Sequence, residues 1–338
     1  SSIMNELRHS TIIPNFSDAL IAHEENDLET AQKLYKEFLI LDPNNPEANY
    51  NLGSIYLTQA DYDRSLKFFK LALEASPNVP IFWSSYIEAL IKLNKISKAK
   101  ILIVASQKAG LKSQKLVEIN DYLCLKHQEP CKKFCECLDD LINAKDYNAV
   151  ISKCMEKIET YPKSAILFGS LARVNIKLKQ DRRAIANLEK AIRLQPTWHE
   201  HLLILGKLYL TMSNYHEAIE CFQNAIRINK NLAEPNYLIG KILEANSEID
   251  ESAFYFKKTV NIDPSFWEAY VSLSNILIKQ NKQAEALSVL EKAIKANANV
   301  ATVYGNIAAI LTELDRPSEA LEYLDKAIKL DPNQESFY

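Results

Sequence analysis

The stretch NLGSIYLTQADYDRSLKFFKLALEASP, residues 51–77, determines the fold, and HLLILGKLYLTMSNYHEAIECFQNAI, residues 201–226, has the same pattern. In both stretches, apolar residues recur at helical spacing on either side of a short polar break, which predicts two amphipathic helices. A small residue lies in the first helix (Gly53 and Gly206) and another lies early in the second (Ser65 and Ala218). Self-similarity across such a distance indicates an array of repeats.

Prolines give the length of the repeat. Six of the twelve prolines have successive sequence separations of 34, 85, 34, 68 and 68, so four of the five separations are whole multiples of 34. The exception is two and a half periods. Because the residue before a proline disfavours helical backbone angles, we expect each of these prolines to follow the second helix of a repeat. They are Pro43, Pro77, Pro162, Pro196, Pro264 and Pro332.

Small side chains recur at the eighth position of the repeat. Small residues where two helices cross let the backbones approach, and larger apolar residues fill the space around them. Because no single repeat can bury its apolar stripe alone, neighbouring repeats must stack. Only Ile87 and Leu138 break the pattern. The small residues are Ala19, Gly53, Ala172, Gly206, Gly240, Ser274 and Ala308.

These residues resemble the tetratricopeptide repeat (TPR) family, over 12–113 as three repeats and over 131–334 as six more. The resemblance implies an all-α fold, a right-handed α-solenoid of about nine helix-turn-helix repeats. It also implies a concave groove that holds a protein or peptide, so the chain is expected to be a scaffold for protein–protein interaction.

Between the two blocks the register slips by half a repeat. The apolar spacing of QKLVEINDYLCLKHQE, in the spacer 114–130, predicts one extra helix that ends before Pro130. The neighbouring repeats also depart from the pattern, since Ile87 and Leu138 replace the small eighth residue. We therefore expect the solenoid to bend or divide at this point.

The order of the two blocks is similar to bacterial proteins in which such arrays are fused to transferases, including glycosyltransferases of the O-GlcNAc transferase and SPINDLY type. This resemblance implies an alternative function, as the substrate-recognition or oligomerisation region of a transferase whose catalytic domain follows residue 338. The final LDPNQESFY, residues 330–338, has the form of LDPNNPEANY at 41–50, which leads into a repeat. We expect residues 335–338 to begin a tenth repeat, followed by further sequence or by self-association through the open C-terminal end.

Composition excludes several classes of protein. A net charge of −3 and a pI of about 6.1 give no basic face for nucleic acid. No apolar run approaches the ~20 residues that a membrane span needs. The first residues, SSIMNELRHS, lack the apolar core of a signal peptide, so we expect a cytoplasmic protein without a membrane contact.

Cysteine and histidine positions raise the question of a metal site. His127, Cys131, Cys135 and Cys137 lie close together in sequence, with Cys124 nearby. Pro130 separates the histidine from the other ligands, and the CxxC pair of compact zinc sites is missing. Small buried thiols are common in cores, so we predict no metal and no cofactor.

No other motif indicates an enzyme. His199 and His201 are two residues apart on a predicted helix, so they point in different directions. Trp83, Trp198 and Trp267 fall near the joints between repeats, where packing is a commoner role than stacking on a ligand. Neither a GxSxG elbow nor a Walker loop occurs, so we predict no catalytic residues in this chain.

The candidate binding residues follow from the family resemblance, which places the ninth position of each first helix on the concave side. In four consecutive repeats the ninth position forms a row of three cations and one amide, which are Arg173, Lys207, Lys241 and Asn275. The second position supplies Glu200, Glu234 and Glu268. The row is either a basic ladder for an acidic segment, or a series in which each lysine pairs with the glutamate of the next repeat, as Lys207 with Glu234. The balance of signs favours the pairing. At the sixth position, an asparagine ladder of the O-GlcNAc transferase kind is mostly absent, since only Asn51 and Asn306 fit it. The candidate partner-binding residues are Arg173, Lys207, Lys241, Asn275, Asn306, Glu200, Glu234 and Glu268.

Overall fold

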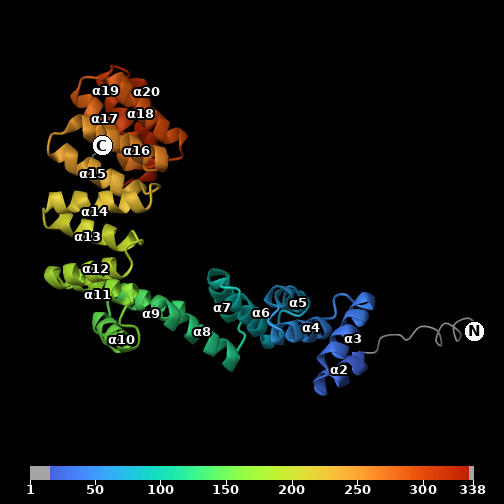
Figure 1. Cartoon of the computed structure of the whole chain (residues 1–338). Helices are drawn as coiled ribbons and strands as arrows, with labels where there is room; N and C mark the ends of the chain where they lie inside the picture. Colours follow the sequence, from blue (N-terminus) through green and yellow to red (C-terminus); the bar gives the residue numbers. More distant parts are fainter. Residues whose placement is uncertain (1–15, 335–338) are drawn as a thin grey trace, which may run out of the picture. The chain divides into compact units, whose positions relative to one another are not determined.

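The computed structural model describes residues 16–334, and every regular element in that range is an α-helix (Figure 1). The predicted all-α solenoid is confirmed. Residues 12–15, where the first repeat was predicted to begin, and the predicted tenth repeat at 335–338 lie outside the described residues. The first helices of the repeats are α2 (Phe16–Glu24), α4 (Pro46–Thr58), α6 (Pro80–Lys92), α9 (Lys132–Asn143), α11 (Ala165–Lys177), α13 (Glu200–Thr211), α15 (Ala233–Ala245), α17 (Trp267–Lys279) and α19 (Ala301–Glu313). The second helices are α3 (Leu28–Leu41), α5 (Tyr62–Ala75), α7 (Ile96–Lys108), α10 (Tyr147–Thr160), α12 (Asp181–Leu194), α14 (Tyr215–Ile228), α16 (Ile249–Ile262), α18 (Gln283–Lys295) and α20 (Pro317–Leu330).

The turn between the two helices has the same backbone in every repeat. One residue adopts the left-handed conformation, with φ between 56° and 63°, and none of these residues is glycine. The amide that follows it donates a hydrogen bond back into the first helix, as Asp61 N does to Tyr56 O at 2.9 Å. This bond satisfies a carbonyl that the helix end leaves without a partner. The left-handed residues are Asn26, Ala60, Asn94, Lys145, Lys179, Ser213, Ser247, Asn281 and Asp315.

The small eighth residue accommodates a large ring from the second helix. A β-carbon added to Gly206 would lie 2.5 Å from Cε1 of Phe222, and one added to Gly240 would lie 2.7 Å from Cε1 of Phe256. Gly53 is in the same relation to Phe69, at 2.7 Å from Cδ1. The three rings are fully buried. The helices of these repeats therefore cross where one of them has no side chain.

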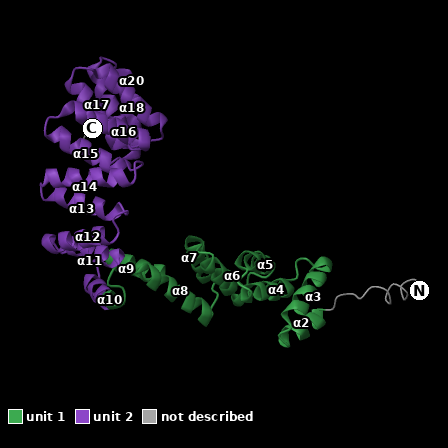
Figure 2. Ribbon diagram, in the orientation of Figure 1, with its two compact units in different colours: residues 1–143, 157–163 green, residues 144–156, 164–338 purple. Residues whose placement is uncertain are grey.

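The described chain divides into two compact units (Figure 2). Unit 1 runs to residue 143 and includes 157–163, and unit 2 contains 144–156 and 164 onward. In unit 1, the pairs α2/α3, α4/α5 and α6/α7 pack in series, and each second helix of the first two pairs also contacts the first helix of the next pair. In unit 2, the five pairs from α11/α12 to α19/α20 are stacked in the same way.

The predicted extra helix is present as α8 (Gln114–His127), and it packs against α6 and α7 within unit 1. Its buried residues, Leu116, Ile119 and Leu123, join the core formed by α5, α6 and α7. Among residues 16–334, no helix is long and apolar enough to cross a membrane.

Candidate functional site

The candidate binding residues lie on the first helices of unit 2, which we call the first-helix face. Because α13 and α15 belong to consecutive repeats, an ion pair between them shows that the first helices of neighbouring repeats approach each other on this face. Lys207 Nζ on α13 forms such a pair with Glu234 Oε1 on α15. The first-helix face comprises Arg173, Glu200, Lys207, Glu234, Lys241, Glu268, Asn275 and Asn306.

The predicted pairing between repeats is confirmed for Lys207 and Glu234. The two side chains are 47% and 46% exposed, so water screens their attraction and the pair contributes only about 0–1 kcal/mol to stability. Such a pair is readily exchanged for contacts with a ligand, because its loss costs the folded state little.

Lys241 is arranged differently. Its Nζ lies 3.4 Å from Glu244 Oε1, one turn along its own helix, rather than against Glu268 of the next repeat. The other carboxylate oxygen, Glu244 Oε2, is buried and has no hydrogen-bond partner within the described residues. A buried carboxylate oxygen without a donor is costly, so Glu244 is stabilised if its side chain turns to meet a donor.

Glu244 lines a hollow of about 300 Å³ at the ends of α15 and α17. Asn275, predicted from sequence, lies in the same wall, as does Lys279. Sequence analysis did not identify Glu244 or Lys279. A signal was present for Glu244, because the twelfth position of the repeat is apolar in the repeats on either side, with Leu210 and Ile278.

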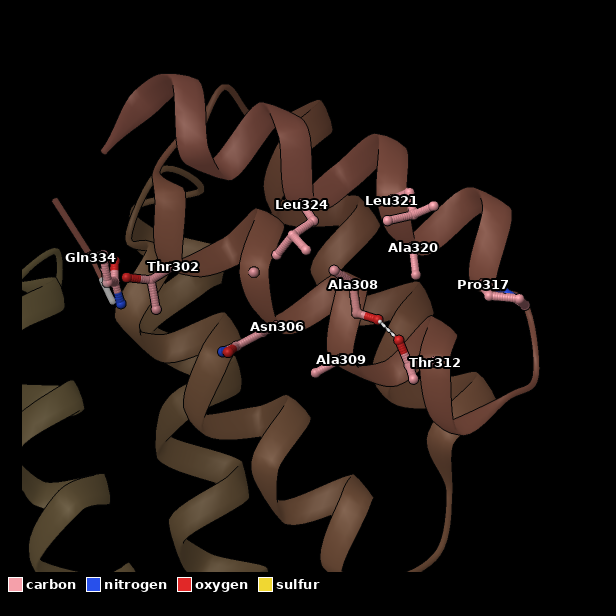
Figure 3. Close-up of a pocket in the computed structure, with 11 residues that line it drawn as sticks. Thr302, Asn306, Ala308, Ala309, Thr312, Pro317, Ala320, Leu321, Leu324 and Gln334 are labelled. Atoms are coloured by element: carbon pink, nitrogen blue, oxygen red, sulfur yellow. Dashed lines mark hydrogen bonds between the residues drawn. The ribbon is translucent and has the colours of Figure 1, made fainter. Parts of the chain in front are cut away.

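Asn306 lines a separate hollow of about 590 Å³ between α19 and α20. Figure 3 shows Asn306 and Thr302 on the α19 side, while Leu321 and Leu324 approach from α20. Leu321 is 62% exposed and Leu324 is half-buried, so both contribute apolar surface to the hollow. This hollow therefore combines polar groups with an open apolar wall.

The remaining members of the face are Arg173, Glu200 and Glu268. Arg173 is half-buried on α11, and Glu200 is exposed at the first residue of α13. Glu200 Oε1 lies 3.8 Å from His199 Nε2. Glu268 is half-buried on α17. The structure thus brings Lys207 together with Glu234, and Asn275 together with Glu244, while Asn306 belongs to another hollow.

His201 packs in the joint between two repeats. It is 8% exposed, and a β-carbon on Gly169 of α11 would lie 2.2 Å from its Nε2. Trp198 stacks on the imidazole with 6.2 Å between ring centroids. Burial lowers the pKa of His201, and its Nδ1 has no hydrogen-bond partner in the described chain. The residue therefore holds the joint as a neutral ring.

The cysteines form no metal site in the described part of the chain, where no group of three or more metal-binding side chains is assembled. All six thiols are free. Burial raises the pKa of Cys124 and Cys221 to about 11, and that of Cys135 and Cys154 to about 12. These thiols stay protonated at neutral pH, which makes them poor nucleophiles and poor ligands.

Comparison with known families gives several matches along the chain. Models described as "Tetratricopeptide repeat" match residues 19–80, 166–197, 268–300 and 301–334. A model described as "TPR repeat" matches residues 206–247. No curated protein matches the sequence.

Several solved structures are similar to parts of the chain, and PilF, with a TM-score above 0.5, has the same fold. PilF of Pseudomonas aeruginosa is 13% identical with a TM-score of 0.52, covering 63% of this chain and 95% of its own. Yeast Tom70 is 15% identical with a TM-score of 0.45, covering 94% of this chain and 76% of its own. YrrB, described as a TPR protein with an unusual peptide-binding site, is 23% identical with a TM-score of 0.42, and the match covers 54% and 95% of the two chains.

Proposed function

Because the chain belongs to the tetratricopeptide repeat family, we propose that it is a non-catalytic scaffold whose first-helix face forms a groove that binds an extended segment of a protein partner. The family supports a role in protein interaction. The groove and its residues are our proposal.

The observation that carries the proposal is the hollow at Glu244 and Asn275. Glu244, whose Oε2 has no donor within the described residues, and the exposed amide of Asn275 both line this hollow, and an amide can both donate and accept. The backbone of an extended peptide offers N–H and C=O groups in alternation, so it satisfies both kinds of side chain. The exposed Lys207–Glu234 pair adds one group of each sign to the same face.

The partner segment is therefore expected to be polar and of mixed charge rather than uniformly acidic. A row of unpaired cations would select an acidic segment, but Lys207 and Lys241 already contact carboxylates. Opposite charges that can re-pair with a ligand give specificity and register more than affinity.

The test uses a charge swap that preserves the internal ion pair. In Lys207→Glu/Glu234→Lys the two charges exchange places, so folding should be unaffected while the pattern presented to a ligand is reversed. A photo-crosslinking amino acid at Asn275, with Glu251 on α16 as the control position, reports which protein occupies the face in the native cell extract. We expect adducts at 275 that the swap removes. Equal adducts at 251, or adducts that persist in the swapped protein, would refute the groove.

The alternative, a recognition region of a larger transferase, is tested by the intact mass of the native protein. A mass well above 38.5 kDa, with transferase sequence in the additional part, would support it. A native mass that matches this chain would exclude it.

We also propose that the hollow between α19 and α20 mediates self-association. The observation in favour is that the exposed Leu321 and the half-buried Leu324 line one open hollow, so a second copy could bury both side chains. Sedimentation at increasing concentration should show a dimer that Leu321→Glu abolishes, while Glu322→Gln, on the same helix, serves as the control. A monomer at all concentrations would contradict this proposal.

A further inference from the structure

The extra helix α8 has the beginning and the end of a first helix. It begins at Gln114, one repeat period after Pro80 of α6, which in turn lies one period after Pro46 of α4. The helix ends at His127 and is followed by Gln128, a left-handed residue whose φ of 56° equals that of Asn94 after α6. The amide of Glu129 then bonds back to Cys124 O at 3.2 Å, as the equivalent amide does in the complete repeats.

The second helix that should pack on α8 is missing from its place. The next helix in sequence, α9, packs too little on α8 to act as its antiparallel partner, whereas α5 packs extensively on α4. Asp121, at the eighth position of α8, is exposed, whereas Gly53 at the eighth position of α4 lies against Phe69 of the second helix α5. Val117, one turn before Asp121, is 51% exposed. α8 is thus half of a repeat.

A groove of about 900 Å³ lies beside this uncovered surface, entirely within unit 1. We call it the half-repeat groove. Its floor is apolar and comes from the last turns of α7 and the first turns of α8, with Val104, Leu111, Leu116 and Val117 among the lining residues.

Lysines surround this floor. Lys108, Lys112, Lys132 and Lys133 line the groove and are exposed, against a single lining carboxylate, Glu136. Glu136 Oε1 lies 3.8 Å from Lys132 Nζ. Within residues 16–334, the other three lysines form no ion pair. The groove thus has an apolar floor and an excess of positive charge at its margin.

We propose that the half-repeat groove binds an amphipathic helix of a partner protein, which takes the position of the missing second helix. The partner helix carries an apolar stripe for the floor and glutamate or aspartate on its flanks for the lysines. Its shape follows from the site, because in the complete repeats of both units the equivalent surface is covered by a helix. Its charge follows from the unpaired lysines, which steer and orient an acidic ligand.

The probe is a displayed library of helical peptides, about 14 residues and ~21 Å long. Leucines are fixed along one stripe, and Glu, Lys, Gln and Ser are allowed at the flanking positions. Selection is carried out on the full chain. We expect recovered peptides to be enriched in Glu over Lys, and selection on Lys112→Glu/Lys133→Glu to reverse that preference.

Three variants locate the binding site of a recovered acidic peptide. Val117→Asp places a charge on the exposed part of the floor and should weaken binding at least tenfold. Lys92→Glu, an exposed lysine at the end of α6 outside the groove, is the matched control and should leave binding unchanged. Lys207→Glu should also have no effect, which separates this groove from the first-helix face.

Some outcomes would overturn the proposal. They are the recovery of no helix, recovery without a charge preference, and binding that Val117→Asp leaves intact. A sample without peptide can also be crosslinked. A crosslink from the groove to a second copy of the chain, or to residues 1–15 of the same chain, would show that another segment occupies the groove and would overturn the proposal of a partner helix. The altered side chains are exposed, so circular dichroism and thermal melting should show that all variants fold.

Discussion

Gly206→Ala tests whether the crossing of two helices in a repeat depends on the absence of a side chain. The new β-carbon would lie 2.5, 2.9 and 3.0 Å from three atoms of the Phe222 ring, whereas ordinary contacts are 3.4–4 Å. The ring is 0% exposed and is enclosed by Ala218, Ile239 and Ile242, so it cannot move into solvent. The helices must then separate.

The magnitude follows from two opposing terms. Overpacking of a core costs about 1–3 kcal/mol. Replacing glycine by alanine within a helix stabilises the helix by about 1 kcal/mol. The difference between the two terms is a net cost of about 0–2 kcal/mol. Because three ring atoms are affected at once, we expect Gly206→Ala to lower the free energy of unfolding by about 1–2 kcal/mol, the upper half of that range.

A double mutant isolates the contact. The chain already contains the alternative solution, because Ala172 and Leu188 occupy the same two positions in the repeat of α11 and α12. Gly206→Ala/Phe222→Leu copies that pair, so it should be no less stable than Phe222→Leu alone. The coupling energy is the cost of Gly206→Ala in the original protein minus its cost in the Phe222→Leu protein, and we expect it to be about 1–3 kcal/mol.

The assay combines urea unfolding followed by circular dichroism with amide hydrogen exchange of α13 and α14, because repeat arrays open locally. Ala172→Gly is the control, since it changes helix propensity by about 1 kcal/mol at the same repeat position without a contact of this kind. Additive effects of the two substitutions, or a stabilised Gly206→Ala protein, would refute the packing argument.

Three further predictions concern stability. Ala218→Leu inserts a large side chain at a fully buried position and should cost about 1–3 kcal/mol in urea unfolding; an unchanged midpoint would contradict the repeat register. Ala60→Gly should raise the thermal midpoint, because Ala60 holds a left-handed φ of 57°, while Ala309→Gly inside α19 should lower it. Burial lowers the pKa of His201 from its ordinary 6.5, so the stability that the neutral ring contributes is fully present above pH ~6.5 and is lost as the pH falls towards the folded-state pKa. His201→Gln should therefore reduce the dependence of the urea midpoint on pH between pH 7 and pH 5. A pH dependence equal to that of the unmodified protein would disprove the assignment.

The repeat pattern was predictable because it depends on local properties that recur. A proline after six of the nine second helices, a small eighth residue in seven of the nine repeats and apolar residues at helical spacing act in the same way wherever they occur, so the helices and the extra helix followed from spacing alone. The pairing of Lys207 with Glu234 was predictable for the same reason, since both positions recur once in each period.

Other features depend on exceptions to the pattern, which repetition does not predict. Lys241 has the same sequence position as Lys207, but Glu244 offers a nearer carboxylate than Glu268 does. Gly169 does not hold the small eighth position of its repeat, so the repeat pattern does not predict that the ring of His201 lies over it. The half-repeat groove could not be predicted, because the register of the sequence does not determine how little α9 packs on α8.

The left-handed turn residues have a consequence for engineering. The nine turns contain asparagine, alanine, lysine, serine and aspartate, so the helices on either side fix the turn conformation and the turn residue itself does not. Each of these residues carries a β-carbon that its backbone disfavours, and glycine would remove that cost. Since the turns belong to different repeats, their effects should add. With Ser247 left in place, because it lines the hollow beside Glu244 and Asn275, the melting temperature of the array can be raised in small, independent steps without altering the proposed binding surfaces.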